Sequence, residues 1–378
     1  MPQDYFGIGS IERLQEILAR EKPRHIFLVH GKESYKACGA EQKVSPLLVG
    51  YQVTPFTDFS VNAKLEDAEK GIAAFREQGC DLVVAVGGGS ALDVGKAIAF
   101  CAEFPGQVGS YLAKKISFPP RRTPLITIPT TAGTGSEATH FAVLYVGKQK
   151  HSLAHPSIIP DYAIIDPSLT FSLSPYITAC TGMDALSQAI ESYWSIHSTP
   201  ESKRYAAEAI PLALAHLKKA VRNPTPEARI GMAQAANLAG KAINISFTTA
   251  CHALSYPITS YFNIPHGHAV ALTLPEMVLY NAEISAEDCR DEGGIDYVKK
   301  AMDDLSSLSG VSSPEELKEQ LEKLIENIGL ERKLAKLGIC SGEDVNIIIK
   351  NGFSPARMAN NPRLVTEESL RGMLERIK

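Results

Sequence analysis

The stretch DLVVAVGGGSALDVGKAIAF, residues 81–100, constrains the fold of this chain more than any other feature. It opens with the apolar run Leu82–Val86, which predicts a buried strand. Three glycines follow and predict a tight turn, after which Ser90 can cap a helix that runs from Ala91 to about Cys101. Because strands that alternate with helices are typical of α/β domains, we expect such a domain here.

The glycine turn also predicts an anion site. Glycines let the backbone approach a ligand, the first N–H groups of a helix point outward, and the helix dipole favours negative charge. The pattern is neither G-x-G-x-x-G nor a Walker loop, since no Lys-Ser/Thr pair follows. The alternative is a plain strand-to-helix turn, but three consecutive glycines in this position favour phosphate binding.

A second loop, PTTAGTGSEATH at residues 129–140, is dense in hydroxyl groups and glycines. It either caps a helix or hydrogen-bonds a polar ligand. Around these loops the sequence predicts a helix at 64–78 and further strands at 24–30, 124–128, 141–146 and 162–166.

After Pro175 the strand-like runs nearly vanish and helical periodicity dominates. We therefore predict two domains, an α/β domain at 1–174 and an all-α domain at 175–378. The predicted helices of the second domain are 176–195, 202–219, 226–244, 247–256, 268–285, 295–307, 314–328, 330–337 and 366–377.

Four side chains in the second domain suggest a metal site. Asp184 and Gln188 are four residues apart and share one face of a helix that Ser174 can cap. His252 and His266 can supply two imidazoles, and this N/O set suits zinc, iron, cobalt, nickel or manganese. The alternative is two solvated histidines and an aspartate on a helix surface.

Two prolines lie between the histidines, at Pro257 and Pro265. They predict that one helix ends and another begins there, so that the two rings converge from different segments.

Composition narrows the class of protein. The net charge of −4 gives no reason to expect nucleic acid or an anionic membrane as a partner. Seven dispersed cysteines without a C-x-x-C pair favour reduced thiols and a cytoplasmic location. The N-terminus has no apolar signal region and no apolar run approaches 18 residues, so we expect neither export nor membrane spanning.

From end to end, the chain resembles the iron-containing (group III) alcohol dehydrogenase family. Several motifs in the same order carry the resemblance: GGGS-xxD-xxK from Gly87 to Lys96, PTTAGTGSE-x-T from Pro129 to Thr139, Lys150, Pro160–Pro167, TGMDAL at Thr181–Leu186, His252, His266-Gly267 and the closing NPR-x-V-T at Asn361–Thr366.

The resemblance implies a Rossmann-like α/β dinucleotide-binding domain followed by an all-α metal and substrate domain, the dehydroquinate synthase-like architecture. It implies a homo-oligomer, which we expect to be a dimer. The family's cofactor residues carry over to Gly31, Gly87, Gly88, Gly89, Ser90, Asp93, Thr130, Thr131, Thr134, Thr139 and Lys150.

The implied activity is NAD(P)-dependent oxidation of an alcohol or reduction of an aldehyde. One divalent metal, iron or zinc, would be held by Asp184, Gln188, His252 and His266. The metal would polarise a carbonyl oxygen as a Lewis acid, and hydride would move between the nicotinamide and the carbonyl carbon.

Three positions depart from the family pattern. Gln188 replaces a usual histidine, which puts tight iron binding in doubt. Tyr256 replaces a second histidine and can donate a proton. Gly31 stands where an aspartate binds the NAD ribose, and Lys32 and Lys36 follow, so we expect NADPH to be accepted at least as well as NADH.

Within the family, the stretch DALSQAIESYW resembles the phosphonoacetaldehyde reductase (hydroxyethylphosphonate dehydrogenase) branch of phosphonate metabolism. Lys241, where the family usually has an apolar residue, and His140 would suit the anionic tail of a small aldehyde. The alternative for Lys241 is that it extends into solvent.

Two other functions remain open. One is a metal-dependent cyclase or lyase of the dehydroquinate synthase type, which would need more basic residues than the sequence offers. The other is a dinucleotide-binding pseudoenzyme with a decayed metal site, suggested by Gln188 and Tyr256.

Overall fold

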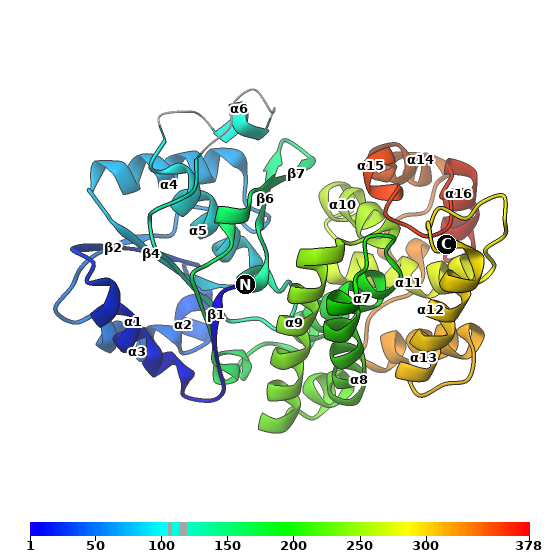
Figure 1. Cartoon of the computed structure of the whole chain (residues 1–378), viewed down its shortest axis with the longest axis horizontal. Coiled ribbons are helices and arrows are strands. Elements are labelled where there is room, and N and C mark those ends of the chain that lie inside the picture. The colour runs from blue at the N-terminus through cyan, green and yellow to red at the C-terminus, as the bar shows by residue number, and fades with distance from the viewer. Residues whose placement is uncertain (105–107, 113–118) are drawn as a thin grey trace. The chain divides into compact units, whose positions relative to one another are not determined.

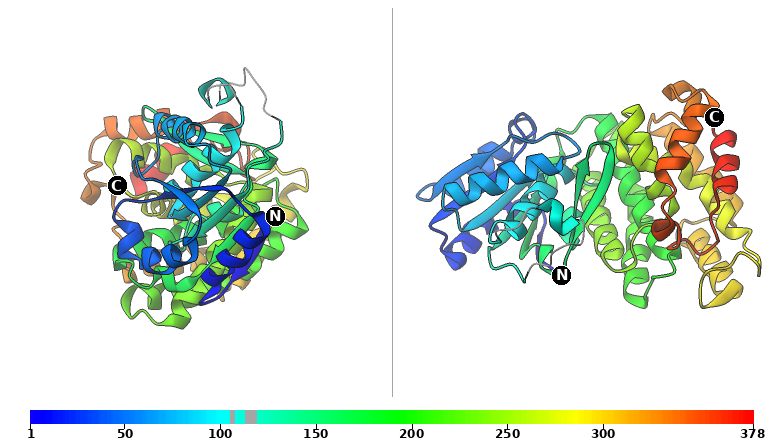
Figure 2. Two further views of the ribbon diagram at one scale, coloured as in Figure 1. Left: turned by 90° about the vertical axis from the view of Figure 1, so that its left-hand side faces the viewer. Right: turned by 90° about the horizontal axis from the view of Figure 1, so that it is seen from above.

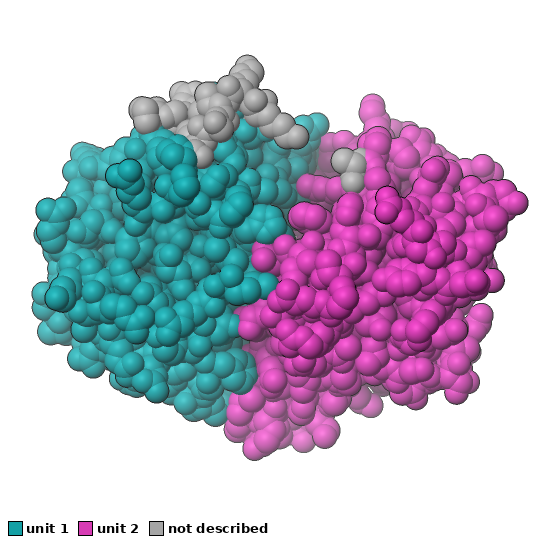
Figure 3. Space-filling view, viewed as in Figure 1, with its two compact units in different colours: residues 1–173 teal, residues 174–378 magenta. Residues whose placement is uncertain are grey.

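The computed structural model describes residues 1–104, 108–112 and 119–378. The chain divides into two compact units, Met1–Leu173 and Ser174–Lys378, which Figure 3 distinguishes by colour. The N-terminal unit contains the parallel sheet and the C-terminal unit is built mainly from helices (Figures 1 and 2). The border lies one residue before the one predicted from the sequence.

The N-terminal unit is an α/β layer structure, as predicted. Its six parallel strands lie in the order β1-β8-β5-β4-β2-β3. Their bounds are β1 (Gln3–Phe6), β2 (His25–His30), β3 (Gln52–Phe56), β4 (Leu82–Gly87), β5 (Leu125–Pro129) and β8 (Tyr162–Ile165). The helices of this unit are α1 (Arg13–Glu21), α2 (Ser34–Ala37), α3 (Ala40–Val44), α4 (Leu65–Glu77), α5 (Gly89–Cys101) and α6 (Val108–Leu112).

Each face of the sheet has its own hydrophobic core. In β2, Phe27 and Val29 pack with residues of α4 and α5, whereas Ile26 and Leu28 pack with residues of α1 to α3. Because side chains alternate along a strand, a sheet covered on both faces needs apolar residues at every position. This is why β2, β4, β5 and β8 are readable in the sequence as continuous apolar runs.

The edge strands β1 and β3 were not predicted. Their sequences, QDYF and QVTPF, contain polar residues and a proline, and most of their positions are exposed or half-buried. An edge strand needs apolar residues only where it meets the core, so its sequence pattern is weak.

The register of the sheet places the candidate cofactor loops together. His30 pairs with Val86, and Gly87 pairs with Pro129. The loops that follow β2, β4 and β5 therefore leave the same carboxyl edge of three neighbouring strands. In open α/β sheets this edge is where ligands bind.

An antiparallel hairpin, β6 (Phe141–Val146) and β7 (Gln149–Ala154), accompanies the sheet. Its buried residues Ala142, Leu144 and Leu153 belong to the core that contains α5. Lys150 lies opposite Tyr145 in this hairpin.

The C-terminal unit matches the predicted succession of helices in most places. Its first helix starts as predicted, because Ser174 Oγ accepts the N–H of Ile177 at 3.3 Å and Pro175 occupies the first turn. Its helices are α7 (Pro175–Trp194), α8 (Pro200–Arg222), α9 (Pro226–Ser246), α10 (Ala250–Phe262), α11 (His266–Ala282), α12 (Gly294–Leu308), α13 (Pro314–Asn327), α14 (Gly342–Gly352), α15 (Pro355–Met358) and α16 (Glu367–Arg376). Within the described residues, no helix combines the length and apolarity that crossing a membrane requires.

Two helix predictions were wrong. Pro257 does not end a helix but lies inside α10, where its ring packs near Gly352; the break comes at Asn263, whose φ is 57°. Tertiary packing there outweighs the lost hydrogen bond of an internal proline. The predicted helix at 330–337 is only a 3-10 turn at Leu334–Leu337, and α14 and α15 were not predicted.

Candidate functional site

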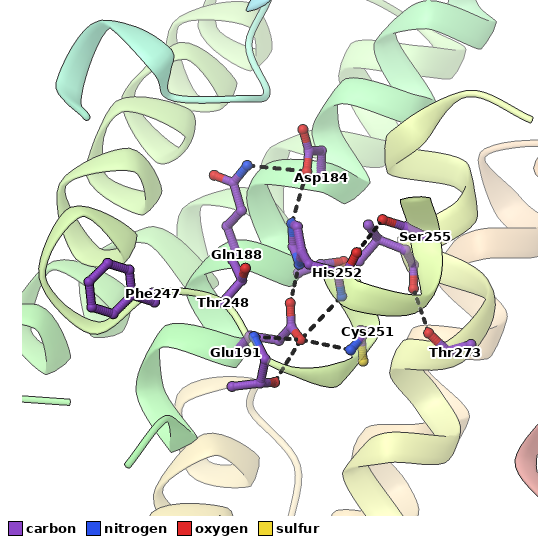
Figure 4. Close-up of polar contacts among 12 residues, drawn as sticks. Asp184, Gln188, Glu191, Phe247, Thr248, Cys251, His252, Ser255 and Thr273 are labelled. Atoms are coloured by element: carbon purple, nitrogen blue, oxygen red, sulfur yellow. Dashed lines mark hydrogen bonds and ion pairs between the residues drawn. The ribbon is translucent and has the colours of Figure 1, made fainter. Parts of the chain in front are cut away.

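One face of α7 carries the polar side chains of the site. Asp184, Gln188 and Glu191 follow each other at intervals of four and three residues, so they lie one above another on the helix. All three are buried, with exposed fractions of 3%, 3% and 0%. Buried carboxylates need charged or hydrogen-bonding partners, and α10 and α11 supply them (Figure 4).

Asp184, His252 and His266 form a cluster that can hold a metal ion. Each offers one ligand atom, and these atoms lie within 4.8 Å of one another. The Nε2 atom of His252 is 3.3 Å from Asp184 Oδ1, and that of His266 is 3.8 Å from the same oxygen. The structure therefore brings together three of the four predicted ligands, from three different helices.

Gln188, the fourth predicted ligand, borders this cluster. Its Nε2 donates to Asp184 Oδ1 at 3.1 Å (Figure 4). If the amide rotated by half a turn, its oxygen and Asp184 Oδ1 would face each other, an arrangement that is favourable only with a cation between the two oxygens. The side chain can thus orient Asp184 or offer a neutral oxygen, but it adds no charge.

Glu191 was missed by the sequence reasoning, although it organises the site. Its Oε1 accepts the N–H groups of Thr249 at 3.2 Å, Cys251 at 2.9 Å and His252 at 3.4 Å, and the hydroxyl of Thr249 at 2.7 Å. These are orphan donors at the start of α10, so a carboxylate from another helix caps α10. Its other oxygen, Oε2, contacts Nδ1 of His252 (Figure 4).

The contact with Glu191 determines how the His252 ring faces the cluster. With Nδ1 held by Glu191, Nε2 is directed at Asp184. Metal-binding histidines generally use one nitrogen for the metal and the other for a carboxylate or carbonyl. The sequence did contain a signal for Glu191, since it is a carboxylate two helical turns beyond Asp184, on the same face of the predicted helix.

The charges of the cluster fit a divalent cation. Burial opposes a charged ring, but Glu191 and Asp184 outweigh it and raise the pKa of His252 to about 10. The proton that this raised pKa keeps on His252 balances part of the charge of the two carboxylates when no metal is bound. As a metal ligand the ring is neutral, and the two buried carboxylates would then carry excess negative charge, which burial penalises. A metal ion would supply the balancing positive charge, so the donor set and its surroundings both suit a metal.

The position of His266 depends on a close approach between α11 and α7. A Cβ atom at Gly267 would lie 1.9 Å from the backbone oxygen of Cys180 and 2.9 Å from the Cβ of Asp184. Only glycine allows the two helices to meet at this distance. The hydroxyl of Ser255 donates to the carbonyl of His252 at 2.7 Å and lies 3.1 Å from Nδ1 of His266, which leaves Nε2 for the cluster.

The predicted catalytic residues lie in different places. The Tyr256 ring stacks on the His266 ring, with centres 5.7 Å apart and planes 8° apart. Lys241 lies on α9, with Nζ 5.9 Å from the centre of the Tyr205 ring on α8. His140 belongs to the N-terminal unit, beside Phe141 at the start of β6.

The glycine turn after β4 lies against the hydroxyl-rich loop after β5. A Cβ atom would come within 3.3 Å of Thr131 at Gly88 and within 2.8 Å of Thr134 at Gly89. The N–H of Thr130 donates to the carbonyl oxygen of Gly87 at 2.9 Å. The predicted loops thus form one compact surface at the carboxyl edge of the sheet.

Ser90 does not cap the helix, which corrects the prediction. Helix α5 begins at Gly89 with Gly88 as its N-cap, and no side chain bonds the cap. The hydroxyl oxygen of Ser90 instead accepts the N–H of Asn62 at 3.0 Å. The N–H groups at the start of α5 are therefore not capped by a side chain.

Asp93 and Thr139, predicted to bind the cofactor, use their polar atoms to hold this loop in place. The carboxylate of Asp93 accepts from Ser136 Oγ at 2.6 Å and from the N–H of Val143 at 3.0 Å. The buried ammonium of Lys96 donates to Thr139 Oγ1 at 2.9 Å. Burial raises the pKa of Asp93 and lowers that of Lys96 to about 8.

Both halves of the chain match models of one protein family. The family model described as iron-containing alcohol dehydrogenase matches residues 2–167, and that of the C-terminal part of the Fe-containing alcohol dehydrogenase family matches residues 178–377. Long-chain-alcohol dehydrogenase 1 of Geobacillus thermodenitrificans is 34% identical over 99% of this chain and 94% of its own.

Two further relatives are named for reductases of aldehydes. Phosphonoacetaldehyde reductase of Streptomyces viridochromogenes is 35% identical over 78% of this chain and 75% of its own. The crystal structure of sulfoacetaldehyde reductase from Bifidobacterium kashiwanohense in complex with NAD+ superposes with a TM-score of 0.88 at 32% identity, covering 100% of this chain and 96% of the other. The chain belongs to the iron-containing alcohol dehydrogenase family and is an oxidoreductase.

Proposed function

We propose that this protein is a metal-dependent, NAD(P)-linked alcohol dehydrogenase that reduces a small aldehyde with an anionic tail. The observation that carries the proposal is the cluster of Asp184, His252 and His266, in which Glu191 holds the ring of His252. Family membership supplies the reaction class, and the names of the two reductase relatives support the kind of aldehyde.

Asp184, His252 and His266 would hold the metal, and Gln188 would orient Asp184 or add its amide oxygen. When bound, the metal supplies polarisation of a carbonyl oxygen and the nicotinamide supplies or accepts hydride. The contribution of the chain is to hold each imidazole by its Nδ1–H, which donates to the Glu191 carboxylate in His252 and to the Ser255 hydroxyl oxygen in His266.

The carboxyl edge of the sheet would bind the dinucleotide. The proposed pyrophosphate site is the start of α5, where glycines expose the first N–H groups of the helix. Thr130, Thr131 and Thr134 would contact the nicotinamide half. The NAD+ bound to the sulfoacetaldehyde reductase relative supports a nicotinamide cofactor, and Gly31 at the end of β2 leaves room for the 2′-phosphate of NADPH.

The proposal is tested by NADPH and NADH oxidation with a panel of aldehydes, using protein reconstituted with iron, zinc, cobalt or manganese. We expect turnover with at least one metal and a higher kcat/KM for phosphonoacetaldehyde or sulfoacetaldehyde than for propanal. His252→Ala should lose bound metal and turnover together. Absence of turnover with every metal and aldehyde in both directions would argue for a dinucleotide-binding protein without this activity.

A further inference from the structure

The exposed side of the metal cluster is formed by a row of three side chains. Asp184 and His252 are buried, whereas His266, Tyr256 and Arg357 are half-buried. The Tyr256 ring is parallel to that of His266 at 5.7 Å, and the guanidinium carbon of Arg357 lies over the Tyr256 ring, 4.4 Å from its centre. These two short distances connect a candidate metal ligand to a permanent positive charge.

Among the residues that the structure describes, Arg357 has no carboxylate partner, in contrast to Arg363 and Arg376 of the same unit. Arg363 pairs with Asp288 at 2.6 Å, and Arg376 pairs with Glu276 at 2.5 Å. A guanidinium that lies over an aromatic ring keeps its in-plane N–H donors for another partner. The donors of Arg357 suit a planar or tetrahedral oxyanion bound by two parallel hydrogen bonds.

The chain holds the segment with Arg357 in place on both sides. Before it, Gly352 packs so closely on α10 that a Cβ atom would lie 3.2 Å from the Cα of Leu254. After it, Asn360 Nδ2 donates to the carbonyl of Thr248 at 3.0 Å, and the N–H of Ile196 donates to the carbonyl of Asn360 at 3.1 Å. Arg357 is therefore positioned against the helix that carries His252 and Tyr256.

We propose that Arg357 binds the anionic group of the substrate, with the Tyr256 ring as the surface between this group and the metal cluster. The substrate class is a short aldehyde with a phosphonate, sulfonate or carboxylate on the carbon next to the carbonyl. This inference rests on the proposed aldehyde reduction and assigns the anion to Arg357 instead of Lys241, which lies beside Tyr205 on α8.

Steady-state kinetics of Arg357→Ala provide the first test. We expect KM for phosphonoacetaldehyde and sulfoacetaldehyde to rise about tenfold or more, the factor that a lost charged hydrogen bond produces. The kcat/KM for propanal should stay within about twofold, because a neutral aldehyde does not use the guanidinium. Arg357→Lys keeps the positive charge but loses the planar pair of N–H donors, so its KM for the anionic aldehydes should lie between those of wild type and Arg357→Ala.

A cationic aldehyde with a quaternary ammonium group makes the test sharper. This aldehyde should be a poor substrate of the wild type. Arg357→Ala should raise kcat/KM for it, because the face of the Tyr256 ring becomes available to the ammonium group. Arg371→Ala, which removes an exposed arginine on α16, is the matched control and should leave the preference for anionic aldehydes unchanged. Lys241→Ala tests the alternative position of the anion site: a loss of the preference in this variant and not in Arg357→Ala would assign the anion to Lys241.

A binding measurement separates this inference from the proposed reaction. Calorimetric titration of the metal-loaded protein with phosphonoacetate, which cannot be reduced here, should give a Kd about tenfold weaker in Arg357→Ala, while acetate should bind equally to both. This measurement tests the role of Arg357 even if the protein turns over no aldehyde. Equal losses for anionic and neutral ligands, or an unchanged Kd for phosphonoacetate, would show that Arg357 does not bind the anion.

Discussion

At the scale of single residues, Glu191 gives the most direct test of how the cluster is held. Glu191→Gln keeps the shape but removes the charge beside Nδ1 of His252. We expect metal affinity to fall by about 10- to 100-fold, as is typical when the carboxylate behind a metal-binding histidine is lost. Competition with a chromogenic chelator measures this, and added metal should restore part of the turnover. Unchanged affinity would mean that Glu191 only caps α10.

A substitution at Gln188 tests the metal site by adding a ligand, whereas the change at Glu191 weakens the support of an existing one. Its amide is neutral and donates to Asp184, whereas an imidazole at this place would add a basic nitrogen one turn from Asp184. Gln188→His should therefore slow the loss of metal during dialysis, measured by metal analysis of the protein. Gln188→Leu is the control and should retain metal no better than wild type.

Gly31 addresses the choice of cofactor. Gly31→Asp should shift the preference from NADPH toward NADH by roughly tenfold or more, because the new carboxylate repels the 2′-phosphate. A Cβ atom there would lie 2.2 Å from Ser34 Oγ, so the hydroxyl must rotate to another position. Gly31→Asn has the same size without the charge and controls for this rearrangement. If both variants lose NADPH equally, the cause is steric.

The residues of the site were predictable to different extents. Asp184, His252 and His266 belong to motifs that are continuous in the sequence, and the structure brings them together. Glu191 was indicated only by its spacing from Asp184, and Arg357 by no pattern in the sequence, because the importance of both depends on contacts with α10 that the folded chain creates.

At the scale of elements, the contact of α11 with α7 sets the geometry of the cluster. Gly267→Ala would place a methyl group against the backbone oxygen of Cys180, which cannot rotate away. We expect a loss of about 1–3 kcal/mol of stability and a large loss of metal affinity, measured by thermal unfolding and metal titration.

The matched control is Gly372→Ala on α16, where a Cβ atom would meet only the end of Arg376 at 3.5 Å. This change should leave metal binding intact and stabilise the helix slightly, because alanine favours helices. If Gly267→Ala binds metal as the wild type does, the two helices can separate without moving His266 from Asp184.

Local signals located some helices and not others: α14 was not predicted, although Ser341 caps it and Val345, Ile348 and Ile349 form its buried face. The start of α7 follows from Ser174 and Pro175, which act locally. Pro257 predicts a helix end because an internal proline is locally unfavourable, yet α10 continues through it where α14 packs on it. Sequence patterns report local preferences, and such tertiary contacts override them.

At the scale of the whole molecule, the loops proposed to bind the cofactor and the cluster proposed to bind the metal belong to different units. Removal of metal by a chelator should therefore abolish aldehyde reduction while NADPH binding changes by less than about twofold. NADPH fluorescence titration measures binding, and turnover should return when metal is restored. Full turnover of the metal-free protein would contradict the proposed role of the cluster.

Because the sheet has a hydrophobic core on each face, its central strands should open to solvent less often than its edge strands. β4 lies inside the sheet, paired with β2 on one side and β5 on the other, and its six residues are buried. Its amides should exchange with solvent deuterium only when the whole N-terminal unit unfolds, more slowly than those of the edge strands β1 and β3. The glycine turn is thus attached directly to the most slowly exchanging strand, so ligand-free protein should already hold its phosphate cradle in one conformation.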